Sequence, residues 1–285
     1  MNFACDREAR RFLARDFHAL KPNQPKKRRR GGRIMMAKGV VKICAIITMV
    51  LALGAAPVLM TEASAQTRLR PGFNLFSLRD DVEIGRQSAM QIERQYRTYE
   101  DPRVTRIGKR LAARSSMPGL PWRFRVIDRS DVNAFALPGG YVYVTSGLLR
   151  AVRSEDELAG VLAHEIMHVT LRHGTNQASK AMLAQAPLQI LSNQLGSGLG
   201  ATLARFGIGL GLNSLFLRYS REAETQADVG AVQLMRRAGY NPYGLANFMR
   251  TMRGGGGFFS DHPSPANRVE RIEEEIRLTG GARRR

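Results

Sequence analysis

The spacing of apolar residues predicts two amphipathic helices in the region that begins near residue 80. Residues 80–98 start with two acidic residues, which helix N-termini favour, and residues 101–115 follow after a short break. Each segment carries its apolar residues at helical spacing, so each presents one face to a core. These residues are Val82, Ile84, Met90 and Ile92 in the first segment and Val104, Ile107 and Leu111 in the second.

The period then changes from helical to alternating. Trp122, Phe124 and Val126 occupy every second position of a short run, which is the pattern of a strand. Residues 133–137 and 141–145 are mainly apolar and flank a Pro-Gly-Gly sequence. They therefore predict a β-hairpin or a similarly tight connection between two strands.

A helix with a marked start follows a shorter helix predicted at 146–152. Ser154 and Glu157 have the spacing of a capping box, in which each side chain bonds to the other residue's backbone N–H. Apolar residues then recur at helical spacing, and Gly174 is placed to end the helix. The spaced apolar residues are Leu158, Val161, Leu162 and Val169.

Three further helices are predicted at 219–238, 242–253 and 265–278. Gly239 separates the first two, and four consecutive glycines at 254–257 separate the last two. The predicted fold class is therefore α+β, a helical body with one small antiparallel β-sheet. No repeat and no second domain are indicated.

The first 65 residues predict an export signal rather than part of this domain. Residues 35–65 hold a basic segment, an apolar run and an Ala-Ser-Ala sequence, in the order of a secretory signal peptide. A permanent membrane anchor is the alternative. Residues 1–34 fit neither a signal nor a domain, and a misplaced start codon or a disordered extension would account for them. We expect a mature periplasmic domain at 66–285, with a basic tail at 279–285.

The formal net charge of +20 is unevenly distributed. Residues 1–65 hold 13 Lys and Arg against 4 Asp and Glu, a contribution of +9 that leaves +11 on the other residues. The remainder has no basic strand interleaved with aromatic residues, so we expect no nucleic-acid partner. Attraction to anionic lipid or envelope polymers explains the excess better. Both cysteines, Cys5 and Cys44, precede residue 66, so the mature domain would contain no disulfide.

His164, Glu165 and His168 form an HExxH motif inside the capped helix. At about 100° per residue the two histidines lie one turn apart and about 40° offset, so both imidazoles can bind one metal ion. Glu165 is rotated away from the ligands, yet it can take a proton from a water whose pKa a bound Zn²⁺ lowers. This spacing seldom arises by chance. It indicates a hydrolytic zinc site with Glu165 as the general base.

A hydrolytic zinc site usually takes three protein ligands. A third histidine at the spacing of the extended motif after His168 is absent. Glu224 and Asp228 are four residues apart on a predicted helix and share a face, so we predict that Glu224 is the third ligand and that Asp228 hydrogen-bonds a ligand imidazole. Glu222 is the rival ligand, but Gln226 at its i+4 position cannot supply the second carboxylate.

Residues 178–217 form a glycine-rich tract whose only charged residues are Lys180 and Arg205. A membrane span is one interpretation, but several Gln and Asn residues make the tract more polar than a typical span. The tract also lies in the sequence between His168 and Glu224, which must bind the same metal ion, so the chain has to lead away from the metal site and return to it. We expect a helical hairpin or mobile lid over the cleft, and peripheral membrane contact is compatible with it.

The motifs resemble those of the gluzincin metallopeptidases that include HtpX and the CAAX prenyl proteases, above all the secreted periplasmic members of the BepA and LoiP type. The resemblance rests on HExxH, on Glu-Thr-Gln-Ala-Asp from Glu224, and on segments 133–149, 164–173 and 262–272. It implies a mainly helical zincin-type peptidase domain with one small antiparallel β-sheet, a bipartite active-site cleft and one Zn²⁺ per chain.

The resemblance also implies roles for two other segments. Asn133, Ala134 and Phe135 resemble the edge strand on which a substrate peptide lies, and such an edge binds extended backbone without reading side chains. A buried structural strand is the alternative. His262 is a second catalytic candidate. It could stabilise the oxyanion, fill the open position of zinc and hold the enzyme latent, or be structural. His173 is expected to pack or cap rather than bind metal.

The function implied by the resemblance is that of a zinc-dependent endopeptidase acting on unfolded or misassembled cell-envelope proteins. A non-catalytic envelope chaperone or assembly factor with a structural zinc is one alternative. Structural zinc sites usually contain cysteine, which the mature domain lacks, and Glu165 would have no use in such a protein. A membrane-integrated peptidase is the other alternative. It would need long spans, which only the N-terminal signal and the 178–217 tract approach.

Overall fold

The computed structural model describes residues 67, 69–185, 217, 219–252, 262 and 267–280. All of them belong to one compact unit, Glu62–Arg285. The predicted extension at 1–34 and signal peptide at 35–65 lie outside the described residues. So does most of the 178–217 tract beyond residue 185, and its hairpin or lid stays a prediction.

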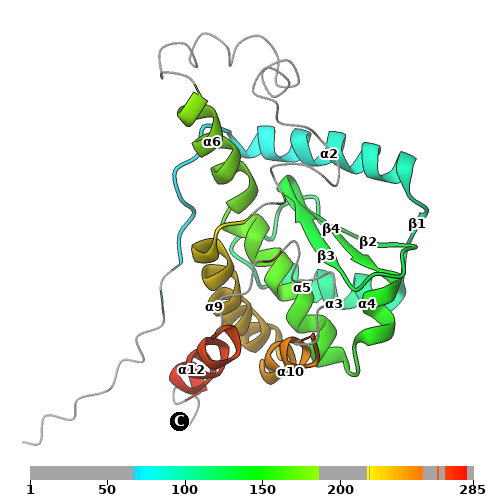
Figure 1. The fold of residues 1–285 in the computed structure, drawn as a ribbon, viewed down its shortest axis with the longest axis vertical. Coiled ribbons are helices and arrows are strands. Elements are labelled where there is room, and N and C mark those ends of the chain that lie inside the picture. Colours follow the sequence, from blue (N-terminus) through cyan, green and yellow to red (C-terminus); the bar gives the residue numbers. More distant parts are fainter. Residues whose placement is uncertain are drawn as a thin grey trace, which may run out of the picture. The chain divides into compact units, whose positions relative to one another are not determined.

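Four strands form one mixed β-sheet in the order β1-β2-β4-β3 (Figure 1). The expectation of an antiparallel sheet is wrong for one pair. β3 and β4 form the predicted antiparallel hairpin, and β1 pairs antiparallel with β2, but β4 runs parallel to β2. The reason is that the hairpin places β4 beside β2 and leaves β3 at the edge. The strands are β1 Thr98–Tyr99, β2 Arg123–Ile127, β3 Ala134–Leu137 and β4 Tyr141–Thr145.

Both faces of the sheet are covered, which explains why every residue of β4 is buried. Val142 and Val144 belong to the main hydrophobic core, which also includes residues of helices α3 and α5. Tyr141 and Tyr143 belong to a second cluster that includes residues of helix α2. The tight turn of η1 (Pro138–Gly140) lies against α2, and Gly139 adopts a φ of 77° there.

Apart from α6, which the sequence did not predict as a separate helix, the helices occupy the predicted positions, with ends that shift by a few residues. In α3 the predicted face is confirmed, because Val104, Ile107 and Leu111 are buried. In α2 it is confirmed only in part. Ile84 and Ile92 are buried, but Val82 is half-buried and Met90 is exposed. The short predicted helix is α4. Helix α5 contains the HExxH motif, and α6, α9, α10 and α12 follow it in the chain. The bounds are α2 Leu78–Gln95, α3 Pro102–Ala112, α4 Ser146–Ala151, α5 Glu155–Thr170, α6 His173–Gln185, α9 Arg221–Ala238, α10 Tyr243–Thr251 and α12 Arg268–Gly280.

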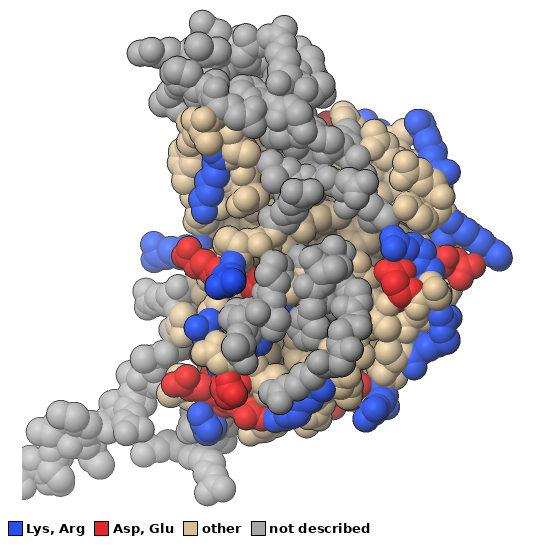
Figure 2. Space-filling view, in the orientation of Figure 1, with Lys and Arg blue, Asp and Glu red and all other residues tan. Residues whose placement is uncertain are grey.

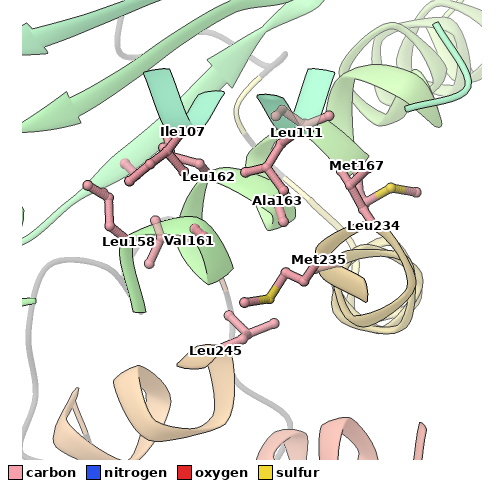
Figure 3. Packing of buried hydrophobic residues seen from close by; sticks show 14 of the residues in the cluster. Ile107, Leu111, Leu158, Val161, Leu162, Ala163, Met167, Leu234, Met235 and Leu245 are labelled. Carbon is pink, nitrogen blue, oxygen red and sulfur yellow. The ribbon is translucent and has the colours of Figure 1, made fainter. Parts of the chain in front are cut away.

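Helix α5 is the centre of the molecule and packs against α3, α9, α10 and β3. Figure 3 shows Leu158, Val161 and Leu162 of this helix in the core with residues of α3, α9 and α10. The close contact of α5 with α10 depends on two glycines. A Cβ on Gly160 would lie 2.7 Å from Leu245 Cα, and one on Gly244 would lie 2.2 Å from Asp156 O. No side chain fits at either position without moving backbone.

The start of α5 confirms half of the predicted capping box. Ser154 Oγ accepts a hydrogen bond from Glu157 N–H, 3.1 Å, but the Glu157 carboxylate accepts from Arg153 N–H, 2.7 Å, one residue before the cap. The predicted end is wrong. The helix ends at Thr170, because Arg172 takes a left-handed φ of 55°, and Gly174 lies inside α6.

Two surface features bear on partners. Lys and Arg side chains lie interspersed with Asp and Glu around the margin of the face drawn in Figure 2, rather than in one stripe. Among the described residues, no helix has the length and apolarity that a membrane span requires.

Candidate metal centre

Helix α5 places His164 and His168 one turn apart in the interior of the molecule. Their Nε2 atoms lie 3.0 Å apart, and neither side chain is more than 2% exposed. Every residue from Glu157 to Thr170 is buried, which is unusual for ionisable side chains such as Glu165. Such burial requires partners for the two imidazoles and for Glu165 between them.

Glu224 reaches this pair from α9, which begins after the N-cap Ser220. Its Oε2 lies 3.3 Å from His164 Nε2, and its Oε1 lies 3.5 Å from His168 Nε2. The rival ligand, Glu222, is exposed and accepts a hydrogen bond from Gln226. The structure therefore brings together the three residues predicted to hold the metal.

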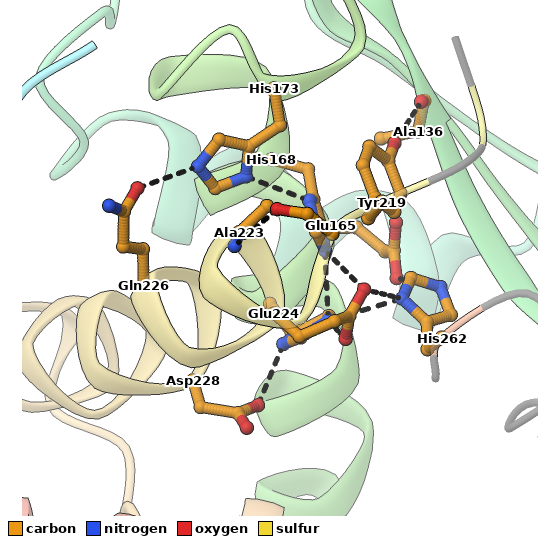
Figure 4. Close-up of polar contacts among 12 residues, drawn as sticks. Ala136, Glu165, His168, His173, Tyr219, Ala223, Glu224, Gln226, Asp228 and His262 are labelled. Atoms are coloured by element: carbon orange, nitrogen blue, oxygen red, sulfur yellow. Dashed lines mark hydrogen bonds and ion pairs between the residues drawn. The ribbon is translucent and has the colours of Figure 1, made fainter. Parts of the chain in front are cut away.

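His262 adds a fourth donor atom to the same space (Figure 4). Its Nδ1 lies 3.0 Å from Glu224 Oε1 and 3.3 Å from His164 Nε2. The ligand atoms of His164, His168, Glu224 and His262 all lie within 4.8 Å of one another. A tetrahedron of ligands about 2.0–2.1 Å from zinc has an edge of about 3.3 Å. The contacts of 3.0 to 3.5 Å between these donor atoms match that edge.

Each histidine of the HExxH pair has its Nδ1 held by another group. His164 Nδ1 lies 3.0 Å from Asp228 Oδ1. His168 Nδ1 lies 2.9 Å from His173 Nδ1, and His173 Nε2 lies 3.1 Å from Gln226 Oε1. If Gln226 accepts from His173 Nε2–H, then His173 Nδ1 accepts from His168 Nδ1–H. Both ligand histidines then direct an Nε2 lone pair at the metal position.

This chain of contacts gives His173 a role that the sequence alone does not indicate. It is not among the candidate ligands but orients one of them. Burial lowers the pKa of His173 to about 4, so the ring is neutral at pH 7 and can accept from His168. A partner on Nδ1 fixes the tautomer and the ring plane of a ligand histidine.

Arg268 is a functional residue that sequence reasoning missed. Its guanidinium donates two hydrogen bonds to Asp228, 2.8 and 2.7 Å, and its Nη1 lies 3.2 Å from Glu224 Oε2. Arg268 is 3% exposed and begins α12, six residues after His262. Burial raises the pKa of Asp228, but Arg268 and His164 outweigh that effect and lower it. Arg268 therefore helps to keep the Asp228 carboxylate ionised, and its guanidinium also forms an ion pair with Glu224.

The charges of the site call for a dication. Glu165, Glu224 and Asp228 are all buried, and Arg268 is the buried guanidinium beside them. With the histidines neutral, three negative charges and one positive charge leave −2. Without metal, burial tends to lower the pKa of His164, but Asp228 and Glu224 outweigh it and raise the value to about 9. Protons then compensate for the charge that a divalent ion would neutralise.

Glu165 is fully buried beside the donor atoms. Its Oε1 lies 3.3 Å from His262 Nε2 without the geometry of a hydrogen bond, so neither carboxylate oxygen has a hydrogen-bond donor among the described residues. Burial raises the pKa of this carboxyl, and the neighbouring His262 and His164 oppose that effect. An unbonded carboxylate with a raised pKa beside a metal position suits a general base that works on water.

The three predicted substrate residues lie at the edge strand β3. Ala134 and Phe135 belong to the strand and Asn133 precedes it, and all three are buried. Phe135 stacks on Tyr143 on the α2 side of the sheet, with ring centroids 5.3 Å apart, away from the metal position. The described residues do not show the bipartite cleft that the resemblance implies. The cavity between β3, His168 and Tyr219 has a volume of about 10 Å³, room for about one water molecule.

Comparisons with known proteins agree with this site. The model of peptidase family M48 matches residues 98–276. The chain is 36% identical over 180 residues to "Mitochondrial metalloendopeptidase OMA1" of Schizosaccharomyces pombe, covering 60% of this chain and 51% of that protein. It is 31% identical over 191 residues to "Beta-barrel assembly-enhancing protease" of Yersinia pestis, covering 59% and 38%.

A third relative, "Metalloprotease YcaL" of Escherichia coli, is 30% identical over 180 residues, covering 61% of this chain and 69% of that protein. The chain thus spans about half the length of the curated relatives it matches. The names of all three relatives describe proteases. The region 98–276, which the family model matches, includes every residue of the site described above.

Proposed function

Because the chain belongs to peptidase family M48, we propose that it is a zinc-dependent endopeptidase. The observation that carries this proposal is the group of donor atoms from His164, His168, Glu224 and His262, with the buried Glu165 carboxylate beside it. The donor set contains nitrogen and oxygen and no cysteine, which is typical of hydrolytic rather than structural zinc sites.

His164, His168 and Glu224 would hold the metal. Zinc bound there would act as a Lewis acid toward the scissile carbonyl and would lower the pKa of a water molecule. Glu165 takes the proton of the attacking water and later gives it to the leaving amine. Its raised pKa favours both steps, since the group can hold the proton between them. Asp228, Arg268 and His173 keep the ligands in place.

We assign His262 the role of a fourth ligand that holds the resting enzyme latent. The position of its Nδ1 among the donor atoms supports this role over oxyanion stabilisation or a purely structural one. Its Nε2 lies 3.3 Å from Ala134 O, so that nitrogen can carry the proton while Nδ1 faces the metal. Hydrolysis then requires His262 to leave, because water needs the fourth position.

The substrates we propose are extended segments of unfolded or misassembled cell-envelope proteins. The name of the relative from Yersinia pestis, a protease that enhances β-barrel assembly, supports an envelope substrate for this chain too. The predicted signal peptide supports a periplasmic location, and the charge of +11 after residue 65 supports peripheral contact with anionic membrane surfaces.

The test is cleavage of casein by the zinc-loaded chain. Glu165→Gln should keep its zinc and lose cleavage by at least about 100-fold, the range that general base catalysis contributes. His262→Ala should cleave faster, up to about tenfold if the open form is about 10% populated in the wild type. Retained cleavage by Glu165→Gln would remove Glu165 from the mechanism. A slower His262→Ala enzyme would point to oxyanion stabilisation instead.

A further inference from the structure

The hydrogen bonds between β3 and β4 determine which backbone groups of β3 point to the outer edge of the sheet. Thr145 N–H donates to Asn133 O, 2.9 Å, and Phe135 lies opposite Tyr143 in the register of the two strands. Backbone groups of alternate residues point to opposite sides of an antiparallel strand. Asn133 and Phe135 therefore face β4, whereas the N–H and C=O groups of Ala134 and Ala136 face the outer edge.

Side chains occupy three of these outward groups. Ala134 N–H donates to Asn133 Oδ1, 2.8 Å, and Ala134 O lies 3.3 Å from His262 Nε2. The hydroxyl of Tyr219 donates to Ala136 O, 3.2 Å. An extended peptide added to this edge would need the same carbonyl oxygens as acceptors for its own N–H groups. The side chains and the peptide therefore compete for the same atoms.

Tyr219 connects this edge to the metal position (Figure 4). Its ring stacks on the ring of His168 with centroids 3.7 Å apart, and its centroid lies 5.7 Å from that of His262, with the ring planes inclined by 29°. The side chain is 8% exposed, and the adjoining cavity holds about 10 Å³. This space cannot contain a peptide strand while Tyr219 stays in place.

We propose that Tyr219 occupies the substrate's backbone position on β3 and that a bound peptide displaces it. This inference rests on the proposed function and specifies its substrate class. The peptide must be extended and must offer N–H groups to Ala136 O and to Ala134 O from residues two apart. A proline at either position cannot donate, so segments with proline there bind poorly. Side-chain identity matters less, because the contacts are to backbone.

A purely protective role is the competing explanation, since natural proteins cover exposed strand edges to prevent aggregation. The two explanations differ in what removal of the hydroxyl does. If Tyr219 competes with substrate, Tyr219→Phe lowers KM because Ala136 O no longer has to lose a partner. If it only protects the edge, KM stays the same and the protein merely aggregates more readily.

The experiment compares zinc-loaded wild type, Tyr219→Phe and the control Tyr240→Phe on an unstructured fluorogenic peptide. Tyr240 is also buried but lies beside Arg110, with Cζ 4.9 Å from its ring centroid. For Tyr219→Phe we expect KM about two- to tenfold lower, the worth of one net hydrogen bond, with kcat within about twofold. Tyr240→Phe should match the wild type. Unchanged KM at equal zinc content, or a kcat loss instead, overturns the proposal.

A binding measurement separates this inference from the peptidase assignment. Fluorescence anisotropy of the same labelled peptide is measured with Glu165→Gln and with Glu165→Gln/Tyr219→Phe. Tighter binding by the double variant supports displacement of Tyr219 even if the wild type cleaves nothing, and equal binding refutes it. Asn133→Ala, which releases Ala134 N–H, serves if Tyr219→Phe does not fold, and it too should bind the peptide more tightly. A peptide with proline at the paired positions should bind more weakly to every variant.

Discussion

At the scale of single residues, the site combines a local pattern with contacts that cross the chain. His164, Glu165 and His168 lie within one turn or so of helix, so their spacing is visible in the sequence. Glu224 could be predicted because Asp228 shares its helix face. The contact of Arg268 with Asp228 joins residues 40 positions apart, and no period reveals it. The contact of Tyr219 with Ala136 joins residues 83 positions apart, and no sequence period reveals it either.

Arg268 gives the residue-scale prediction. Arg268→Met leaves Asp228 and Glu224 buried without their cation, so we expect the metal-free protein to lose about 3–5 kcal/mol of unfolding free energy. Arg268→Lys should lose less, because it keeps the charge but not the paired hydrogen bonds. Urea unfolding of the chelated proteins measures both losses.

The matched control for that prediction is Arg271→Met on the same helix. Arg271 is exposed and donates to Thr225 Oγ1, so its replacement should cost no more than about 0.5 kcal/mol. If Arg268→Met and Arg271→Met unfold at the same urea concentration, the guanidinium of Arg268 does not hold the two carboxylates.

At the scale of elements, the sequence predicted the type of most helices and strands better than their ends and neighbours, but it did not predict β1 or α6. The alternation at Trp122 to Val126 predicted one strand correctly, and the Pro-Gly-Gly turn predicted the hairpin of β3 and β4. The parallel pairing of β2 with β4 was missed, because strand order depends on packing and not on period. The end of α5 was missed because Arg172 is held by Asp81 and Phe76 O, which overrides the weaker signal of Gly174.

The contact between α5 and α10 gives the element-scale prediction. Gly160→Ala would bring a methyl group to 2.7 Å from Leu245 Cα, so the two helices must separate. We expect a net loss of about 1–2 kcal/mol, because overpacking costs about 1–3 kcal/mol and alanine returns up to about 1 kcal/mol of helix propensity. Gly119→Ala, with no atom within 4 Å of the added Cβ, should stay near wild type. Thermal unfolding of both variants decides. Equal melting temperatures would show that α5 and α10 adjust without cost.

At the scale of the whole molecule, the metal position joins segments that are far apart in the chain. Its donors come from α5, α9 and His262, and Arg268 links it to α12. A metal bound there stabilises the fold by about 4 kcal/mol when its free concentration is about 1,000 times its dissociation constant. The burial of Glu165, Glu224 and Asp228 makes the chelated protein depend on protons instead.

That dependence predicts how the chelated protein responds to pH. The pKa of His164 is raised to about 9, above the usual 6.5, so its contribution is full below about 6.5 and is lost as pH rises through about 9. The pKa of His173 is lowered to about 4, so its neutral form favours the fold above about 6.5 and stability is lost as pH falls toward about 4. Thermal unfolding of chelated protein should therefore show its highest melting temperature at about pH 6.5, with a fall as pH rises toward about 9 and as it drops toward about 4. A melting temperature that rises steadily through pH 9 contradicts this.

The account depends above all on Glu224 closing a metal site begun by His164 and His168. Its most direct test is the zinc content of purified protein, compared between wild type, Glu224→Gln and Glu222→Gln. We predict one zinc per chain in the wild type and in Glu222→Gln, because the replaced carboxylate is exposed. Glu224→Gln should hold less than about a tenth of that. Loss of a hydrogen-bond partner of a ligand typically lowers metal affinity about 10–100-fold, and loss of the ligand itself should lower it more. Full zinc in Glu224→Gln, or loss of zinc in Glu222→Gln, would contradict the site.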